Sequence, residues 1–249
     1  DPRDTRSITP QPCLPPQPTG PVLAVHTLSA SAYEDLRHCP YRFFAQRMLG
    51  LRAVDELDAE VDKREFGLWL HAVLQAFHAA LAEQPIADLA ARTALLDRCS
   101  TEVTAAMALP EGEFLPFAAA WPAVRDGYLD WLSRHEAQGA VFASGEMPQR
   151  QRIGPVTLIG RTDRTDTLPD GTVMLLDYKT EPVGKTRTRI QDPLEDTQMA
   201  FYAALLPHDT LRAAYVNVGE RGETQLHEQD EVVHLRDVLI EGIQHDMAR

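Results

Sequence analysis

Apolar residues recur at helical spacing between residues 62 and 83. With about 3.6 residues per turn, they fall on one side of a helix and predict an amphipathic element packed on a core. Gly67 and His71 lie one turn apart on a flank of this stripe, and we expect Gly67 to leave space beside the imidazole for another backbone segment. We expect His78, on the same flank, at the surface. The stripe consists of Phe66, Leu70, Val73, Leu74, Phe77 and Leu81.

Further helices are predicted on both sides of this one. The first ordered helix is expected from Ser31, where Ser31 and Glu34 fit a capping box, and Pro40 begins a second stretch that ends near Gly50. Helical spacing also covers 86–108, 117–137, 193–206 and 235–247. One apolar stripe is expected to belong to the core rather than to form a platform for stacked bases: Trp121, Val124, Tyr128, Trp131 and Leu132.

Strand patterns begin after Gly139. They cover 141–147, 156–165, 172–180 and 211–218. Helices, then a hairpin sheet, then a helix and a strand predict an α/β sandwich with an inserted helical region. We expect one domain over 28–249, helical over 28–138 and α/β over 139–249. A flexible linker, residues 1–27, precedes it, because its first 24 residues carry seven prolines and no apolar periodicity.

Pro169-Asp170-Gly171 is a turn signal between two of these strands. If the hairpin is centred on Asp170, Asp163 lies directly opposite Asp177, with Cβ atoms roughly 4.5–5.5 Å apart. Two carboxylates at that distance repel each other unless a cation lies between them or one is protonated. A register shift of one residue would remove this juxtaposition.

The second strand of this hairpin ends with Asp177-Tyr178-Lys179. Alternation places Asp177 and Lys179 on one face and Tyr178 on the other. A carboxylate there can hold a divalent cation, and an amine can activate water or stabilise charge on a phosphate. The triplet therefore predicts a site for phosphate chemistry at the end of a buried strand.

Composition limits the classes of function. The 249 residues, 44% of them hydrophobic, suffice for a sizeable core, and no apolar run approaches the roughly 20 residues of a membrane span. We therefore expect no membrane partner. The scattered cysteines Cys13, Cys39 and Cys99 indicate a reducing compartment, the cytoplasm, rather than a disulfide framework. The chain has no Gly-x-x-x-x-Gly-Lys-Ser/Thr loop, which argues against an NTPase.

The net charge of −13 is unfavourable for a surface that binds nucleic acid throughout. The charge is uneven, however, and basic residues gather in two segments. These segments are either solvated faces or local basic patches beside an acidic metal site, and the second is compatible with a nuclease. They contain Arg37, Arg42, Arg47 and Arg52 in the first segment and Lys185, Arg187 and Arg189 in the second.

Four motifs occur in order along the chain: Gly67-x-x-x-His71, Gly160-Arg-Thr-Asp163-Arg164-Thr-Asp166, Leu176-Asp177-Tyr178-Lys179-Thr180 and Gln198-x-x-x-Tyr202. This order resembles the RecB-type branch of the PD-(D/E)xK nuclease superfamily. Residues 28–44, with Cys39-Pro40, resemble the start of the nuclease domain in AddB-like helicase–nuclease subunits. The resemblance covers residues 28–206 and implies a restriction-endonuclease-like mixed sheet flanked by helices, and phosphodiester hydrolysis.

The resemblance also implies a metal site. His71, Asp163 and Asp177 match the side-chain ligands of Mg²⁺ or Mn²⁺, and the backbone carbonyl of Tyr178 is a further expected ligand. Oxygen ligands suit both cations, whereas imidazole is better tolerated by Mn²⁺, so we expect a mild preference for manganese. The two carboxylates count among the expected catalytic residues.

Lys179 matches the family's catalytic lysine, which positions the attacking water or offsets charge on phosphorus. Gln198 and Tyr202 match the motif on the helix after the active-site strand, and with Thr180 they are expected to bind DNA or support the site. AddB-like domains also carry four cysteines for an iron–sulfur cluster. Cys39 matches the first, but no cysteine follows Cys99, so no such cluster is expected in this chain.

Plainer roles exist for several of these residues. Asp166 is a rival of Asp163 as a ligand, but alternation places it on the opposite face, and we expect a structural role. Glu146 lies on the preceding strand and could join the site, but we do not assign it to the metal. Lys179 could be no more than a salt-bridge partner of Asp177, and the two residues of the last motif could be packing residues.

These observations predict a metal-dependent DNA nuclease. We expect an exonuclease that acts on single-stranded DNA or unwound ends in double-strand-break repair or recombination, as part of a larger protein with a helicase domain or subunit as partner. The alternative is a catalytically inactive DNA-binding or scaffolding module that retains the fold. The net charge of −13 favours this alternative, whereas two facing carboxylates oppose it, because an inactive site has no physical need for them.

Overall fold

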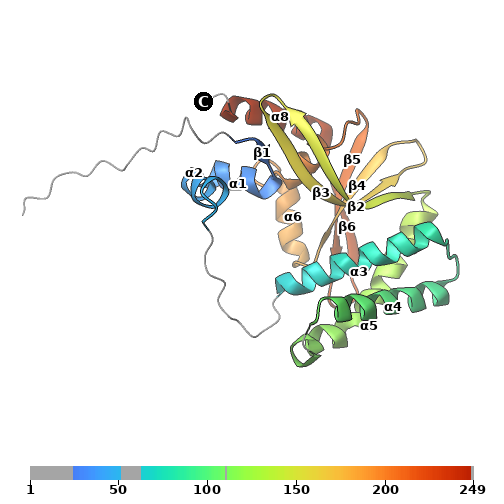
Figure 1. Cartoon of the computed structure of the whole chain (residues 1–249). Helices are drawn as coiled ribbons and strands as arrows, with labels where there is room; N and C mark the ends of the chain where they lie inside the picture. The colour runs from blue at the N-terminus through green and yellow to red at the C-terminus, as the bar shows by residue number, and fades with distance from the viewer. Residues whose placement is uncertain (1–24, 52–62, 110, 248–249) are drawn as a thin grey trace, which may run out of the picture.

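The computed structural model describes residues 25–51, 63–109 and 111–247. The part of the predicted linker at 1–24, and Arg52 of the first basic segment, lie outside the described residues. Within them a six-stranded mixed sheet is flanked by helices, which confirms the predicted fold class (Figure 1). None of the described helices combines the length and apolar character that crossing a bilayer requires.

The sheet is built around β3. Strand β2 pairs antiparallel with β3 along almost the whole length of one edge of β3. Strands β1 and β4 therefore share the other edge of β3, where β1 pairs in parallel and β4 antiparallel. Beyond β4, the parallel strand β5 and then the antiparallel strand β6 complete the sheet. The strands are β1 (Thr27–Leu28), β2 (Val141–Ile153), β3 (Val156–Thr167), β4 (Val173–Lys179), β5 (Leu211–Val218) and β6 (Thr224–Gln229).

One face of the sheet is covered by three long helices, which lie together below it in Figure 1. They are α3 (Lys63–Glu83), α4 (Leu89–Ala106) and α5 (Glu111–Ala137). The predicted stripe of α3 is buried against β4 and β5, with Leu81 partly buried. The predicted stripe of α5 is likewise buried, which confirms that it belongs to the core. Helix α5 starts before the predicted boundary at 117 and carries two prolines inside, Pro116 and Pro122.

Shorter helices cover the opposite face and the start of β3. Helices α1 and α7 and the C-terminal α8 pack on Val156 and Leu158 of β3, and α7 also packs on Leu175 of β4. These elements are α1 (Ala30–His38), α2 (Pro40–Phe43), the π-helical turn η1 (Phe44–Met48), α6 (Val183–Gln191), α7 (Gln198–Ala204) and α8 (Val232–Met247).

The start of α1 differs from the prediction. Ser29, not Ser31, is the N-cap, and its Oγ accepts a hydrogen bond of 3.2 Å from the Ala32 N–H. The predicted capping box is therefore wrong, because the helix has already begun at Ser31. The expected second stretch from Pro40 is confirmed, and Gly50 follows it with a φ of 66°.

Three elements have no counterpart in the sequence pattern: β1, α6 and β6. Strand β1 has only two residues, α6 is rich in Thr, Lys and Arg, and β6 is largely polar. Helix α7 begins at Gln198 rather than at 193, because 192–196 form a turn in which the Asp192 carbonyl accepts from Glu195 and Asp196. Polar segments of this kind are held by tertiary contacts rather than by an apolar stripe of their own.

Candidate active site

The β3–β4 hairpin has the predicted register. Backbone pairing runs up to Arg164 and Leu176. Asp163 and Asp177 lie one residue beyond, and there Asp163 Oδ2 accepts a hydrogen bond of 2.8 Å from the backbone N–H of Tyr178. The β3–β4 ladder therefore ends one residue before the two predicted carboxylates.

His71 reaches this point from α3. Its Nδ1 lies 3.4 Å from Asp163 Oδ2, and its Nε2 donates to the Tyr178 carbonyl oxygen at 3.1 Å. One turn earlier, a Cβ built on Gly67 would lie 3.4 Å from Thr180 Oγ1. The neighbour of Gly67 is thus a side-chain hydroxyl, not the backbone segment that the sequence predicted. Three of the predicted ligands, the imidazole, one carboxylate and one carbonyl, come together here.

Glu146 on β2 joins this group, although the sequence did not assign it to the metal. Its Oε1 lies 3.8 Å from His71 Nδ1, and one ligand atom each from His71, Glu146 and Asp163 lie within 4.8 Å of one another. A β-bulge between Phe142 and Ser144 brings Glu146 into register with Asp163, and without it the two would be offset by one residue. Glu146 also has a φ of 49°, a strained left-handed conformation of the kind that clusters at functional sites.

Asp177 and Lys179 point to the face of the sheet that carries α7. Lys179 Nζ donates to Gln198 Oε1 at 2.8 Å, and Gln198 Nε2 donates to Asp177 Oδ1 and to the Tyr202 hydroxyl, both at 3.2 Å. Lys179 Nζ also forms an ion pair of 2.7 Å with Asp177 Oδ2, outside hydrogen-bond geometry, so this buried oxygen accepts no hydrogen bond from a described residue. Among the described residues, Asp177 is not part of the group formed by His71, Glu146 and Asp163.

The charges of the site are strongly coupled. Burial would lower the pKa of His71, but its hydrogen bonds to Asp163 and Glu146 outweigh burial and raise the pKa to about 10. Burial raises the pKa of Asp177 above its usual range, although the positive charge of Lys179 opposes this shift. Without a metal ion, the positive charge of the protonated imidazole thus partly neutralises the negative charge of the carboxylates. A bound cation would neutralise this charge instead.

Asp166, the rival ligand, is fully buried and is bound elsewhere. His135 Nε2 lies 2.7 Å from its Oδ2, and Arg164 Nε donates to its Oδ1, also at 2.7 Å. Burial would raise the pKa of Asp166, but the hydrogen bond from His135 and the charge of Arg164 outweigh burial and lower it. Because both oxygens have buried partners, the contacts of Asp166 agree with the expected structural role.

The prediction that His78 lies at the surface is wrong. Its side chain is 4% exposed, and its Nε2 lies 2.6 Å from the Tyr128 hydroxyl and 2.9 Å from Arg164 Nη1. Burial and then the charge of Arg164 hold the pKa of His78 well below its usual value, so the neutral ring accepts from these donors. The Tyr128 hydroxyl also lies 2.8 Å from the hydroxyl of Tyr178. We call these residues, with Asp166 and His135, the buried polar network.

The network has a direct connection to the site through Tyr178. The side chain of Tyr178 is anchored by Tyr128 on one face of β4, while its backbone contacts both His71 and Asp163. The donor set of His71, Glu146 and Asp163 fits a divalent cation that prefers oxygen ligands and tolerates imidazole. Asp177 Oδ2 is instead paired with the Lys179 ammonium group.

A family model of the PD-(D/E)XK nuclease superfamily matches residues 27–248. The chain belongs to this superfamily. PD-(D/E)XK nucleases are hydrolases that use divalent metal ions, in agreement with the donor set around His71. No curated protein matches the chain. Among solved structures, a proposed exonuclease from Eubacterium rectale is 12% identical, with a TM-score of 0.42, and the match covers 90% of this chain and 80% of that one.

Proposed function

We propose that this PD-(D/E)XK nuclease is of the RecB/AddB type and hydrolyses phosphodiester bonds of DNA with bound Mg²⁺ or Mn²⁺. One observation carries the proposal. His71 Nδ1 on α3 lies 3.4 Å from Asp163 Oδ2 on β3, and the ion pair of Asp177 and Lys179 lies at the end of the neighbouring strand β4. Metal ligands and a basic group of this kind suffice for phosphate chemistry.

In this proposal His71, Asp163, Asp177 and the carbonyl of Tyr178 hold the cation, and Glu146 adds a further carboxylate. The cation supplies Lewis-acid stabilisation of the phosphate when it is bound. With a pKa of about 10, His71 must release a proton before its nitrogen can become a ligand. The imidazole supports a preference for Mn²⁺ over Mg²⁺.

Lys179 is the proposed catalytic lysine. Its ammonium group is held between Asp177 and Gln198, so its position is fixed before substrate binds. There it positions the attacking water or offsets the charge that develops on phosphorus. Tyr202 fixes Gln198 through the contact between its hydroxyl and Nε2, and Thr180 supports the turn of α3 that precedes His71.

The finer parts of the proposal rest on the four ordered motifs. They are an exonuclease action on single-stranded DNA or unwound ends, a role in double-strand-break repair or recombination, a helicase domain or subunit as partner, and a cytoplasmic location.

Degradation of labelled single-stranded DNA with Mg²⁺ or Mn²⁺ tests the proposal. Asp177→Ala and Lys179→Ala are expected to lower the rate by about a hundredfold or more, because each removes a charge that acts in the transition state. Asp130→Ala is the matched control, since this carboxylate lies 70% exposed on α5 and should leave the rate unchanged. Equal rates of cleavage by all four proteins would contradict the proposed catalytic roles. No cleavage by the wild-type protein with either metal would support the scaffolding module, which the net charge of −13 favours.

A further inference from the structure

One face of the β2–β3 ribbon continues outward from the proposed metal site. Side chains alternate along a strand, and directly opposed residues share a face. Arg161 lies two positions from Asp163 on β3, so it shares that face, and its Nη1 lies 3.7 Å from Glu146 Oε2. Farther along the ribbon, Arg150 and Arg152 of β2 lie opposite residues 159 and 157, on the same face. The three arginines, which we call the arginine track, therefore start beside the proposed ligands.

The arginine track faces solvent, whereas the opposite face of the ribbon is covered. All three arginines are exposed, and the side chain of Arg161 retains 59% of its accessible surface. On the opposite face, Val156 and Leu158 are buried against α1, α7 and α8. In Figure 1 the ribbon runs from the centre of the sheet toward α8, which packs on that covered face. The arginines are thus accessible to a partner.

Neighbouring carboxylates do not neutralise the outer part of the track. The net charge of the chain is −13, but residues 147–162 contain these three arginines and neither aspartate nor glutamate. Arg150 and Arg152 form no ion pair with any residue that the structure describes. In the two basic segments predicted from the sequence, by contrast, four members are ion-paired: Arg42 and Arg47 with Asp35, and Lys185 and Arg189 with Glu181.

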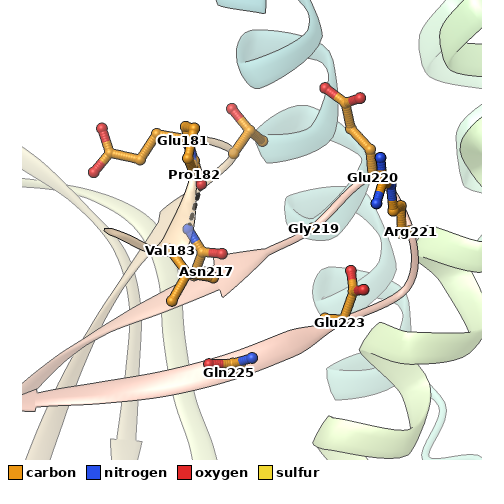
Figure 2. Close-up of a pocket in the computed structure, with 10 residues that line it drawn as sticks. Glu181, Pro182, Val183, Asn217, Gly219, Glu220, Arg221, Glu223 and Gln225 are labelled. Atoms are coloured by element: carbon orange, nitrogen blue, oxygen red, sulfur yellow. Dashed lines mark hydrogen bonds between the residues drawn. The ribbon is translucent and has the colours of Figure 1, made fainter. Parts of the chain in front are cut away.

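The other side of β4 is acidic. Across the sheet, β2 and β3 lie on one side of β4, and β5 and β6 lie on the other. A pocket of about 520 Å³ lies on this second side, between the end of β4 and the β5–β6 hairpin (Figure 2). Its lining includes Glu181, Glu220 and Glu223, with Arg221 as the basic residue among the lining residues. A polyanion is therefore attracted to the ribbon rather than to this hairpin.

We propose that the arginine track binds the sugar–phosphate backbone of the substrate strand on one side of the scissile bond. The inference rests on the proposed nuclease function and specifies where its substrate lies. Guanidinium groups form bidentate, charge-assisted hydrogen bonds with phosphate, and such contacts position a strand without reading its sequence. From Asp163 to Thr157, opposite Arg152, β3 rises roughly 20 Å at about 3.3 Å per residue. This length spans at most about six phosphates at about 3.4 Å each.

Binding of a labelled single-stranded oligonucleotide without metal tests the track independently of hydrolysis. The variant is Arg150→Gln/Arg152→Gln, and the matched control is Arg98→Gln/Arg134→Gln, which removes the same charge from exposed positions on α4 and α5. By fluorescence anisotropy, we expect the variant to bind about tenfold more weakly at low salt. The slope of log Kd against log salt should fall by about 0.7 for each lost contact, or about 1.4 in total. Unchanged binding, or equal losses in variant and control, would overturn the proposal and leave the arginines to an acidic protein surface.

The position of the track along the strand gives a second readout. In single-stranded oligonucleotides, one phosphate at a time is replaced by a neutral methylphosphonate, leaving the scissile phosphate intact. For the wild-type protein, kcat/KM is expected to fall about fivefold at up to about six neighbouring positions, on one side of the cut only. The double variant should lose most of this dependence, and at least about tenfold more activity on the oligonucleotide than on bis-para-nitrophenyl phosphate, a diester too short to reach the track.

A flat profile, or equal sensitivity on both sides of the cut, would overturn the track and leave the nuclease function standing. If the wild-type protein cuts no oligonucleotide with either metal, the nuclease function is overturned, and the binding experiment still decides whether the track holds a strand.

Discussion

At the scale of single residues, His71 has two states that compete. In the metal-free protein it carries a proton that both Asp163 and Glu146 hold in place, and its pKa rises to about 10. As a metal ligand the same ring must be neutral. In the proposed metal site, the carboxylates that would hold the cation therefore also stabilise the proton that excludes it. Metal binding at neutral pH must displace this proton.

This competition predicts a pH dependence of metal affinity. Since the metal-free pKa lies well above neutrality, the association constant for Mn²⁺ should rise about tenfold per pH unit between about pH 6.5 and about pH 8.5. Calorimetry in two buffers of different ionisation enthalpy should show the release of about one proton per ion. His71→Gln, which has no such proton, should bind more weakly with a flatter dependence. An affinity independent of pH in the wild-type protein would contradict the coupling.

Glu146 provides the second prediction at this scale. If it is a ligand, Glu146→Gln should weaken Mn²⁺ binding by about tenfold or more, because one carboxylate charge leaves the donor set. The exposed Glu195, on the loop before α7, provides the matched control Glu195→Gln. Binding can be followed by calorimetry or by the manganese electron-spin signal, independently of activity. Unchanged affinity would show that Glu146 serves only to hold His71.

At the scale of elements, the buried polar network joins β3 to two helices. Arg164 is 1% exposed, binds Asp166 on its own strand and reaches His78 on α3 and Tyr128 on α5. These contacts fix α3, which carries His71, relative to β3, which carries Asp163. The geometry of the proposed metal site thus depends on the charged side chain of Arg164, although Arg164 contacts none of the proposed ligands.

Arg164→Met is therefore expected to destabilise the protein by about 3–5 kcal/mol, because it leaves Asp166 buried without its charged partner. Arg134→Met on α5 is the control, since this side chain is 63% exposed and its ion pair with Asp130 contributes about 1 kcal/mol at most. Denaturant unfolding of the metal-free protein measures both. The double variant Arg164→Met/Asp166→Leu should recover part of the loss, since it removes the buried charge as well. Equal stability of the two single variants would contradict this role.

At the scale of the whole molecule, the sequence predicts the parts that depend on local pattern. The stripe of α3 and the β3–β4 register follow from periodicity and a turn signal, and they suffice to bring Asp163 beside Asp177 along the strands. The position of Glu146 beside Asp163 cannot be predicted from the sequence, because it depends on a β-bulge that the alternation of polar and apolar residues does not reveal. The burial of His78 depends on Arg164, 86 positions away, which a helical pattern alone does not contain.

The divided edge of β3 has one more consequence. Strands β1 and β4 pair with opposite ends of that edge, so no described strand pairs with 159–163 on this side, whereas β2 pairs with most of these residues on the other side. Because the peptide groups of a strand alternate between its two edges, about every second one at 159–163 has no described strand as its neighbour. The position of such a main-chain group does not depend on the side chain of its residue, so substitutions at the proposed metal ligands would leave these groups in place.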